Sequence, residues 1–135
     1  MYVRRLRSGD EAIVERLATR EPRTALLDDP QVIFLAAFDD GETPLGFVLA
    51  YELSRRHGDA TQLLVYEVDV DESHRRRGIG KALLGELATI ARERGIVEGW
   101  VLTDEDNEAA MALYRSAGGI LPQEVTMWEF RYTQD

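Results

Sequence analysis

Three apolar runs rich in β-forming residues follow one another in the middle of the chain, and only short polar turns separate them. They cover Val32–Phe38, Leu45–Leu53 and Leu63–Val70. The first turn, Asp39–Pro44, has the acidic, glycine-containing composition of a hairpin connection. Strands joined this closely pair antiparallel, because a parallel pair needs a crossover of about a dozen residues or more. We therefore predict an antiparallel meander, which restricts the chain to folds built around a sheet.

From Gly78 the apolar residues recur at spacings of three and four, which is typical of an amphipathic helix. We expect this helix to end near Gly95 and a strand to follow over Val97–Leu102. The helical spacing returns over Asn107–Ala117 and stops at two glycines, as in a glycine-terminated helix. Strands separated by helices after a meander indicate β-α-β crossovers, so the sheet must be mixed.

The two ends of the chain complete the expected sheet. The further elements are a strand over Tyr2–Leu6, a helix with apolar residues from Ile13 to Ala18, a short helix over Arg23–Asp28, and a final strand pair over Ile120–Gln123 and Thr126–Tyr132. We predict a single α/β (α+β) domain over the whole 135-residue chain. Its sheet is expected to be mixed but mostly antiparallel, with six or seven strands and helices on both faces.

Charge and composition exclude several functions. The chain has 16 Lys and Arg against 25 Asp and Glu, a formal charge of −9, which disfavours a nucleic-acid binder. It has no cysteine, which excludes disulfides, thiolate metal sites and thiol nucleophiles. His57 and His74 lie in polar turns without metal-ligand spacing, so no metal is expected. No stretch approaches the roughly 18 apolar residues of a membrane span, and we expect a soluble, cytoplasmic protein without membrane contact.

The strongest chemical signal lies in residues 75–81, Arg-Arg-Arg-Gly-Ile-Gly-Lys, which we call the cradle. It sits between a predicted strand and a predicted helix. Glycines let backbone N–H groups approach an anion, and the helix dipole favours negative charge at that end. Arg76, Arg77 and Lys81 add positive charge. The pattern is not the GxxxxGK[ST] nucleotide loop, and a solvated basic turn is the alternative interpretation.

Two motifs stand in a fixed order along the chain. The strand Tyr-Glu-Val-Asp-Val is followed by RRRGIG, and NxxAxxLYxxxG begins at Asn107 about 30 residues later. Together they resemble the GNAT superfamily of acetyl-CoA-dependent N-acetyltransferases. Within it, the pieces LAAFDDGETPLGFVLAYEL, YEVDVDESHRRRGIGKALL and AAMALYRSAG are most similar to small, single-domain aminoglycoside 3-N-acetyltransferases. The resemblance implies the GNAT fold and acetyl transfer to an amino group, the 3-amino group, of an aminoglycoside antibiotic, which would confer resistance.

The resemblance also implies that the cradle binds acetyl-CoA. Arg75 takes the first position of the Q/R-x-x-G-x-G/A motif, and Gly78 and Gly80 take its glycine positions. The backbone amides would hold the CoA pyrophosphate. The residues concerned are Arg75, Arg76, Arg77, Gly78, Ile79, Gly80 and Lys81.

By the same resemblance, the strand before the cradle splays away from its neighbour and binds the pantetheine arm. Val68, Asp69 and Val70 occupy that stretch, and the Val70 N–H is expected to meet the oxyanion. Asn107 matches an asparagine that helps to hold the arm. It could equally be a helix N-cap, and the two roles can coexist.

Two side chains are expected to take part in acetyl transfer. Glu67 would orient the acceptor ammonium or relay its proton through water, since a carboxylate is a weak base toward an amine. Tyr114 matches the tyrosine that protonates the departing thiolate, with core packing as the alternative. Asp69 shares a sheet face with Glu67, and two carboxylates there favour a cationic substrate. A solvated acidic face is the other interpretation.

Further acids mark the start of the second helix. Asp104 and Glu108 are secondary substrate-site candidates, because an acidic segment occupies this place in the similar aminoglycoside enzymes. Acids at a helix N-terminus also stabilise the helix, by ~0.3–1 kcal/mol per charge, without any substrate role.

Three hypotheses follow for the function. The first is an acetyltransferase acting on an aminoglycoside, a small cationic amine. The second keeps the activity but changes the acceptor to a polyamine, an amino acid or a protein amine. The third is a non-catalytic acyl-CoA-binding module. The final strand pair suggests a homodimer, and Met127 and Trp128 are expected in the core or an interface.

Overall fold

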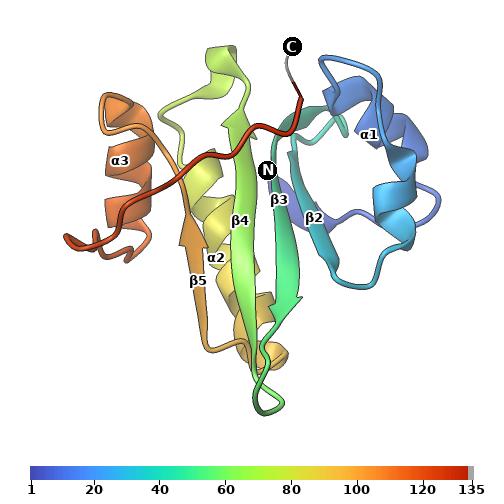
Figure 1. Ribbon diagram of the computed structural model, residues 1–135. Coiled ribbons are helices and arrows are strands. Elements are labelled where there is room, and N and C mark those ends of the chain that lie inside the picture. Colours follow the sequence, from blue (N-terminus) through green and yellow to red (C-terminus); the bar gives the residue numbers. More distant parts are fainter. Residues whose placement is uncertain (134–135) are drawn as a thin grey trace.

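The computed structural model describes residues 1–133 and is built around one five-stranded sheet with the order β1-β2-β3-β4-β5 (Figure 1). The strands pair antiparallel from β1 to β4, whereas β4 and β5 pair parallel. Their bounds are β1 (Tyr2–Arg5), β2 (Val32–Phe38), β3 (Pro44–Ser54), β4 (Thr61–Val70) and β5 (Glu98–Val101). The predicted meander, β2 to β4, is therefore present, and the sheet is mixed and mostly antiparallel as expected.

Helices cover both faces of the sheet. They are α1 (Glu11–Leu17), α2 (Ile79–Glu93) and α3 (Glu108–Ser116), with short 3-10 helices η1 (Thr24–Asp28) and η2 (Glu72–His74). The short helix predicted over Arg23–Asp28 is thus the 3-10 helix η1. Within residues 1–133, no helix has both the length and the apolar composition needed to cross a bilayer.

The core is centred on β2, which is buried at every position. On one face, its residues Ile33 and Leu35 pack with Leu83 and Leu87 of α2. On the other, Phe34 and Phe38 belong to the group that includes Val14 of α1. A strand covered on both sides needs apolar residues at successive positions, which explains the uninterrupted sequence VIFLAAF. At the β4–β5 end of the sheet, fewer residues are buried than in β2, and the predicted site lies at this end.

The prediction of a final strand pair is wrong for the described residues. Residues 119–133 form no helix or strand, so the sheet has five strands in place of six or seven. Apolar and polar residues alternate over 128–133, but alternation alone does not make a strand. A strand also needs a neighbouring backbone to pair with, and none of the described loop hydrogen bonds involves residues 120–133.

Arg4 of β1 and Asp10 fix the start of α1 to the sheet. The Arg4 guanidinium donates two hydrogen bonds of 3.0 Å to the Asp10 carboxylate, and the Arg7 N–H donates a third of 2.8 Å. The hydrogen bond from Arg4 is the main reason that the pKa of Asp10 is lowered. A carboxyl with a lowered pKa in the folded state stabilises the fold above its ordinary pKa, here 3.8, and loses that contribution as the pH falls through the folded value.

We therefore expect Asp10→Asn to lower the free energy of unfolding by about 1.5–3 kcal/mol at neutral pH. The difference from the unsubstituted protein should shrink as the pH falls below 3.8. Urea unfolding at a series of pH values measures it, with the exposed Asp59→Asn as the control. A difference that stays constant with pH would contradict the role of the Asp10 carboxylate.

Candidate functional site

The cradle joins η2 to α2, and its backbone turns into the left-handed region twice. Arg76 has φ 67° and Gly78 has φ 78°. Left-handed residues in a turn can bring successive N–H groups into a concave, anion-binding arrangement. Gly78 is also the N-cap of α2 and offers no side chain to the first N–H groups of the helix. With the exposed Arg77 and Lys81 nearby in sequence, these amides form a site suited to an anion such as a pyrophosphate.

Gly78, the N-cap of α2, and Gly85, inside the helix, are both exposed and form a matched pair for testing the left-handed turn. At both Gly78 and Gly85, an added Cβ would meet nothing within 4 Å, so only backbone conformation distinguishes them. Gly78→Ala places a side chain at φ 78° and should lower the free energy of unfolding by about 1–2 kcal/mol. Gly85→Ala lies inside the helix and should raise it by about 0.5–1 kcal/mol. Chemical unfolding measures both, and equal effects of the same sign would contradict the left-handed turn.

Gly80 has a different role, because its missing side chain lies against another helix. A Cβ at Gly80 would stand 3.0 and 3.1 Å from the two methyl carbons of Leu113 on α3. The two glycine positions of the motif therefore favour a small residue for different reasons. Gly78 allows the turn, and Gly80 allows α3 to pack on α2.

Beyond its midpoint, β4 has a free edge on the side of β5. Among residues 1–133, the two strands pair only from Gln62–Glu98 to Val65–Val101, so β4 continues from Tyr66 to Val70 without a partner there. The register aligns Val70 with Gly46 and Val68 with Val48, and the Asp71 N–H donates to the Leu45 carbonyl. Backbone groups of successive residues alternate in direction, so Val68 and Val70 direct theirs to the free edge and Asp69 directs its own toward β3. Arg75 Nε donates to the Val70 carbonyl at 3.2 Å, and the Val70 N–H is left facing the edge.

The free edge begins at a β-bulge. Glu67 pairs with Leu49 and Val65 pairs with Ala50, so Tyr66 is the extra residue. Bulges bend a strand and re-aim its side chains. The bulge thus coincides with the point at which β4 leaves β5.

The bulge also sets the face on which the acids lie. Glu67 and Asp69 pair with Leu49 and Phe47, which belong to the core group on the α1 side, so both carboxylates share the face opposite α2, as predicted. Both are exposed. Arg75 of the cradle lies 3.8 Å from Asp69, so the chain itself supplies a cation for one carboxylate and leaves Glu67 as the freer acid.

Two tyrosines stand beside Glu67, and the sequence analysis missed them. Tyr51 and Tyr66 meet edge to face with ring centroids 5.7 Å apart. Burial raises the pKa of Tyr51, and the neighbouring Tyr66 and Glu67 raise it further. The sequence does contain a signal for the bulge that brings these rings together. The apolar residues of β4 that face α2 are Leu63, Val65, Val68 and Val70, and the step of three between Val65 and Val68 marks the bulge.

The second helix motif lies on α3, which packs against α2 at Gly80 and has no fully buried residue. Asn107 is the N-cap, and its Oδ1 accepts a hydrogen bond of 3.0 Å from the Ala110 N–H. The cap role is therefore confirmed, and the cofactor role stays a prediction. Tyr114 is partly buried, and burial raises the pKa of its phenol, which keeps the group protonated at neutral pH.

The remaining candidates do not converge with these groups. Asp104 and Glu108 are exposed at the start of α3, and neither enters an ion pair among residues 1–133. Their role at the acceptor site stays a prediction, and their position at a helix N-terminus agrees with the alternative reading. In the described part of the chain, no group of three or more His, Asp or Glu side chains is placed to hold a metal ion.

Comparison with known proteins decides the family. Residues 3–118 match the model of the acetyltransferase (GNAT) family. The chain belongs to the GNAT family. Members of this family use acetyl-CoA, and the amides of the cradle and the free edge of β4 suit its pyrophosphate and its amide-bearing arm. The GNAT resemblance drawn from the two sequence motifs is thus confirmed, whereas the aminoglycoside subclass is not.

The relatives of this GNAT chain differ in their acceptors. A [ribosomal protein bS18]-alanine N-acetyltransferase of Escherichia coli is 32% identical over 87 residues, which cover 61% of this chain and 59% of that enzyme. The match thus spans less than two thirds of that relative. A solved aminoglycoside acetyltransferase from an uncultured soil metagenomic sample is 28% identical, with a TM-score of 0.86 and 98% of both chains covered. A ribosomal-protein-alanine N-acetyltransferase of Brucella melitensis is 25% identical, with a TM-score of 0.76 over 97% of this chain and 98% of the other.

Proposed function

We propose that the chain is an N-acetyltransferase that moves an acetyl group from acetyl-CoA to an amino group of a cationic acceptor, an aminoglycoside. The observation that carries the proposal is the position of Glu67. It is exposed on the bulged half of β4, next to the strand edge that no other described strand pairs with. A reactive thioester on that edge would lie beside a carboxylate able to receive the ammonium.

The residues divide the reaction between them. Acetyl-CoA supplies the acetyl group as an activated thioester. The Glu67 carboxylate accepts a hydrogen bond from the acceptor ammonium and takes its proton, directly or through water, so that the amine can form the new N–C bond. The Val70 N–H donates to the carbonyl oxygen as negative charge develops there. The C–S bond then breaks, and Tyr114 gives a proton to the departing thiolate. The nitrogen of the tetrahedral species loses its second proton, which returns through water to the Tyr114 phenolate, so the products are the neutral amide and the free thiol.

Support for an aminoglycoside comes from the acid balance and from the solved neighbour. Glu67 is exposed and enters no ion pair among residues 1–133, whereas Arg75 lies 3.8 Å from Asp69, so a cationic acceptor would supply a partner for Glu67. The aminoglycoside acetyltransferase superposes on this chain with a TM-score of 0.86, against 0.76 for the ribosomal-protein-alanine N-acetyltransferase of Brucella melitensis. Among the amino groups, the 3-amino group is the proposed position.

The sequence relatives favour a second acceptor, the α-amine at the N-terminus of a protein. The 32% identity to an alanine N-acetyltransferase supports it. The same three groups would serve that reaction, because the chemistry differs only in the amine. The two acceptors differ in what surrounds the amine, which is a peptide backbone in one and several further ammonium groups in the other.

A thiol assay separates these acceptors cleanly, because the chain contains no cysteine. A thiol-reactive dye then reports only the CoA released. We expect acetyl-CoA-dependent release with aminoglycosides that carry a 3-amino group and little with those that lack it. A peptide with an N-terminal alanine, spermidine and free amino acids complete the panel. Turnover of the peptide alone would contradict the aminoglycoside proposal, and binding of acetyl-CoA without turnover of any amine would contradict the transferase proposal itself.

A further inference from the structure

Tyr66 is the most exposed aromatic side chain within the strands of the sheet, with 60% of its surface exposed. The expectation of Met127 and Trp128 in the core is wrong, because both are more exposed still, but they lie outside the sheet. Tyr66 differs from them in standing next to Glu67, the acid proposed to receive the acceptor. Aromatic rings beside a few convergent polar groups are typical of small-molecule sites.

The bulge places Tyr66 and Glu67 on the same face of the sheet. Side chains of successive strand residues normally point to opposite faces. Glu67 lies opposite Leu49 and therefore on the α1 side. Tyr66 meets Tyr51, which packs against the core group on that side, so the Tyr66 ring lies there as well. The extra residue of the bulge thus brings a ring and a carboxylate, adjacent in sequence, to one surface.

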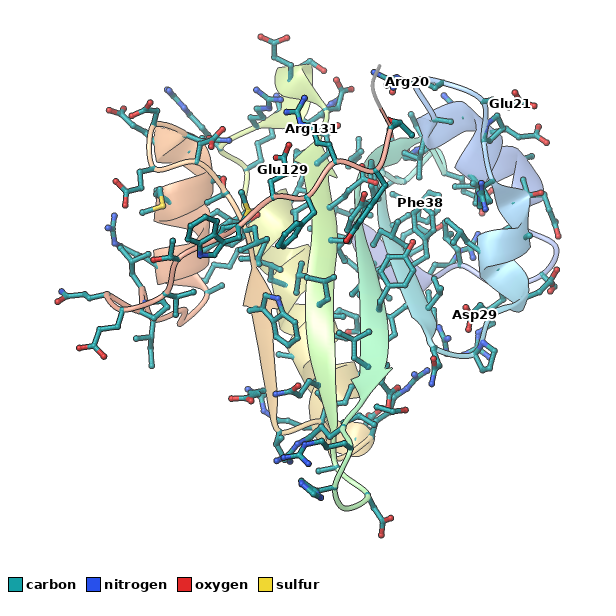
Figure 2. All side chains as sticks on the ribbon, viewed as in Figure 1. Arg20, Glu21, Asp29, Phe38, Glu129 and Arg131 are labelled. Atoms are coloured by element: carbon teal, nitrogen blue, oxygen red, sulfur yellow. The ribbon has the colours of Figure 1, made fainter. Side chains whose placement is uncertain are left out.

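Within residues 1–133, no helix covers this part of the face. Figure 2 shows Phe38, a member of the core group on the α1 side, on the face turned to the viewer. In the same view, α1 lies beyond β2, α2 lies behind the sheet, and only the C-terminal segment passes in front of β4 (Figure 1). That segment leaves 60% of Tyr66 exposed. The Tyr66 ring and the exposed Glu67 carboxylate are therefore open to a ligand.

Tyr51 holds the ring of Tyr66 from one side. The ring centroids are 5.7 Å apart and the ring planes are nearly perpendicular, at 88°. An edge-to-face contact occupies at most one face of either ring, so at least one face of Tyr66 stays free. Burial raises the pKa of the Tyr51 phenol, and Tyr66 and Glu67 raise it further, so this group stays neutral beside the acid. The surface therefore combines one flat apolar face with one free carboxylate.

We propose that the free face of Tyr66, which we call the platform, binds the ring that carries the acceptor amine. The apolar C–H face of a saturated ring stacks on Tyr66, while the ammonium on the same ring meets Glu67. The C–H groups of such a ring carry slight positive charge and suit the negative face of an aromatic ring. The inference rests on the proposed acetyltransferase activity and narrows its acceptor class to amines borne on saturated rings, such as amino sugars and aminocyclitols.

The charges on this face favour a ring over a linear polyamine. A linear polyamine needs several free acids spaced along its length. Of the two acids on this strand face, Asp69 already has Arg75 at 3.8 Å, which leaves Glu67 for one ammonium. The rest of the acceptor then meets the platform. A rigid ring loses little conformational freedom when it stacks, whereas a linear chain must be ordered bond by bond.

Calorimetric titration of a 3-amino aminoglycoside into protein saturated with CoA measures acceptor binding, because CoA has no acetyl group to transfer. We expect Tyr66→Ala to raise the dissociation constant of the aminoglycoside about tenfold, since the apolar contact with the ring is lost. The dissociation constant of CoA should stay within about twofold. Tyr66→Phe keeps the flat face and should bind the aminoglycoside within about twofold of the unsubstituted chain.

The matched control is Tyr2→Ala, which removes an exposed tyrosine from β1, at the other end of the sheet. It should leave aminoglycoside binding within about twofold. Tyr51→Leu removes the supporting ring and should weaken aminoglycoside binding without weakening CoA binding, whereas Tyr51→Phe should leave both unchanged. If Tyr66→Ala and Tyr2→Ala bind the aminoglycoside equally well, the platform is overturned.

A pair of simple amines tests the preference for a ring. Cyclohexylamine and hexylamine have the same number of carbons and one amine each, and they differ in the ring. As competitive inhibitors of aminoglycoside acetylation, we expect cyclohexylamine to be the stronger and the difference to disappear in Tyr66→Ala. Equal inhibition of the unsubstituted chain would overturn the preference. If the unsubstituted chain acetylates no aminoglycoside, the proposed function fails, and the calorimetric titration still decides whether the platform exists.

Discussion

Replacing Glu67 with glutamine is expected to lower kcat/KM for the amine acceptor about 100-fold while leaving the dissociation constant of acetyl-CoA unchanged. Glutamine keeps the size of the side chain but removes both the charge that attracts the ammonium and the oxygen that takes its proton. Glu67 is the freer of the two acids on its face, because Arg75 lies 3.8 Å from Asp69.

The control is Glu86→Gln, which removes the same charge from an exposed position on α2. It should leave the kinetics within about twofold of the starting protein, as expected for a surface charge far from the reaction. Acetyl-CoA binding is measured by calorimetry and turnover by the thiol assay. If Glu67→Gln and Glu86→Gln have equal kinetics, Glu67 has no part in the reaction and the acceptor must meet another base.

The second large effect is expected from Gly80→Val. The added side chain would press on Leu113, whose methyl carbons already stand 3.0 and 3.1 Å from the position of a Cβ. Overpacking of this kind costs about 1–3 kcal/mol of unfolding free energy. Because α3 carries Asn107 and Tyr114 and has no buried residue to anchor it, the helix should shift and turnover should fall at least tenfold.

Leu113→Ala provides the matched rescue, since it removes the methyl groups that the new side chain meets. We expect the double variant to recover part of the stability and part of the activity lost in Gly80→Val. The coupling free energy, from a double-mutant cycle of urea unfolding, should be about 0.5–3 kcal/mol. Additive effects would mean that Gly80 serves another purpose, such as the approach of the anion.

Much of the fold was predictable because its signals are local. The apolar, β-rich runs of β2 and β3 and the short turn between them define the meander, and the glycines at positions 78, 95 and 118 all adopt positive φ at or next to helix ends. The C-terminal strands were not predictable in the same way. An alternating sequence is compatible with a strand, but it does not show whether a neighbouring strand is available to pair with it.

The parts of the site formed by residues close together in sequence were predictable. The parts that depend on side-chain packing were not. The cradle and Glu67 lie together because β4 runs directly into η2 and α2. Two features needed coordinates. These are the ion pair that joins Arg75 to Asp69 and the contact of Tyr51 with Tyr66 across a bulge. The net charge of −9 likewise hides a basic cradle that lies against an acidic strand face.

Hydrogen exchange of the backbone amides with and without saturating acetyl-CoA tests most directly whether the cofactor binds at the cradle and the free edge of β4. We expect slower exchange at Val68, Val70 and residues 76–81, where the N–H groups face the free edge or the cradle, and unchanged exchange in α1, which lies on another part of the fold. Equal exchange at these amides with and without acetyl-CoA, or protection confined to other elements, would contradict the assignment of the site.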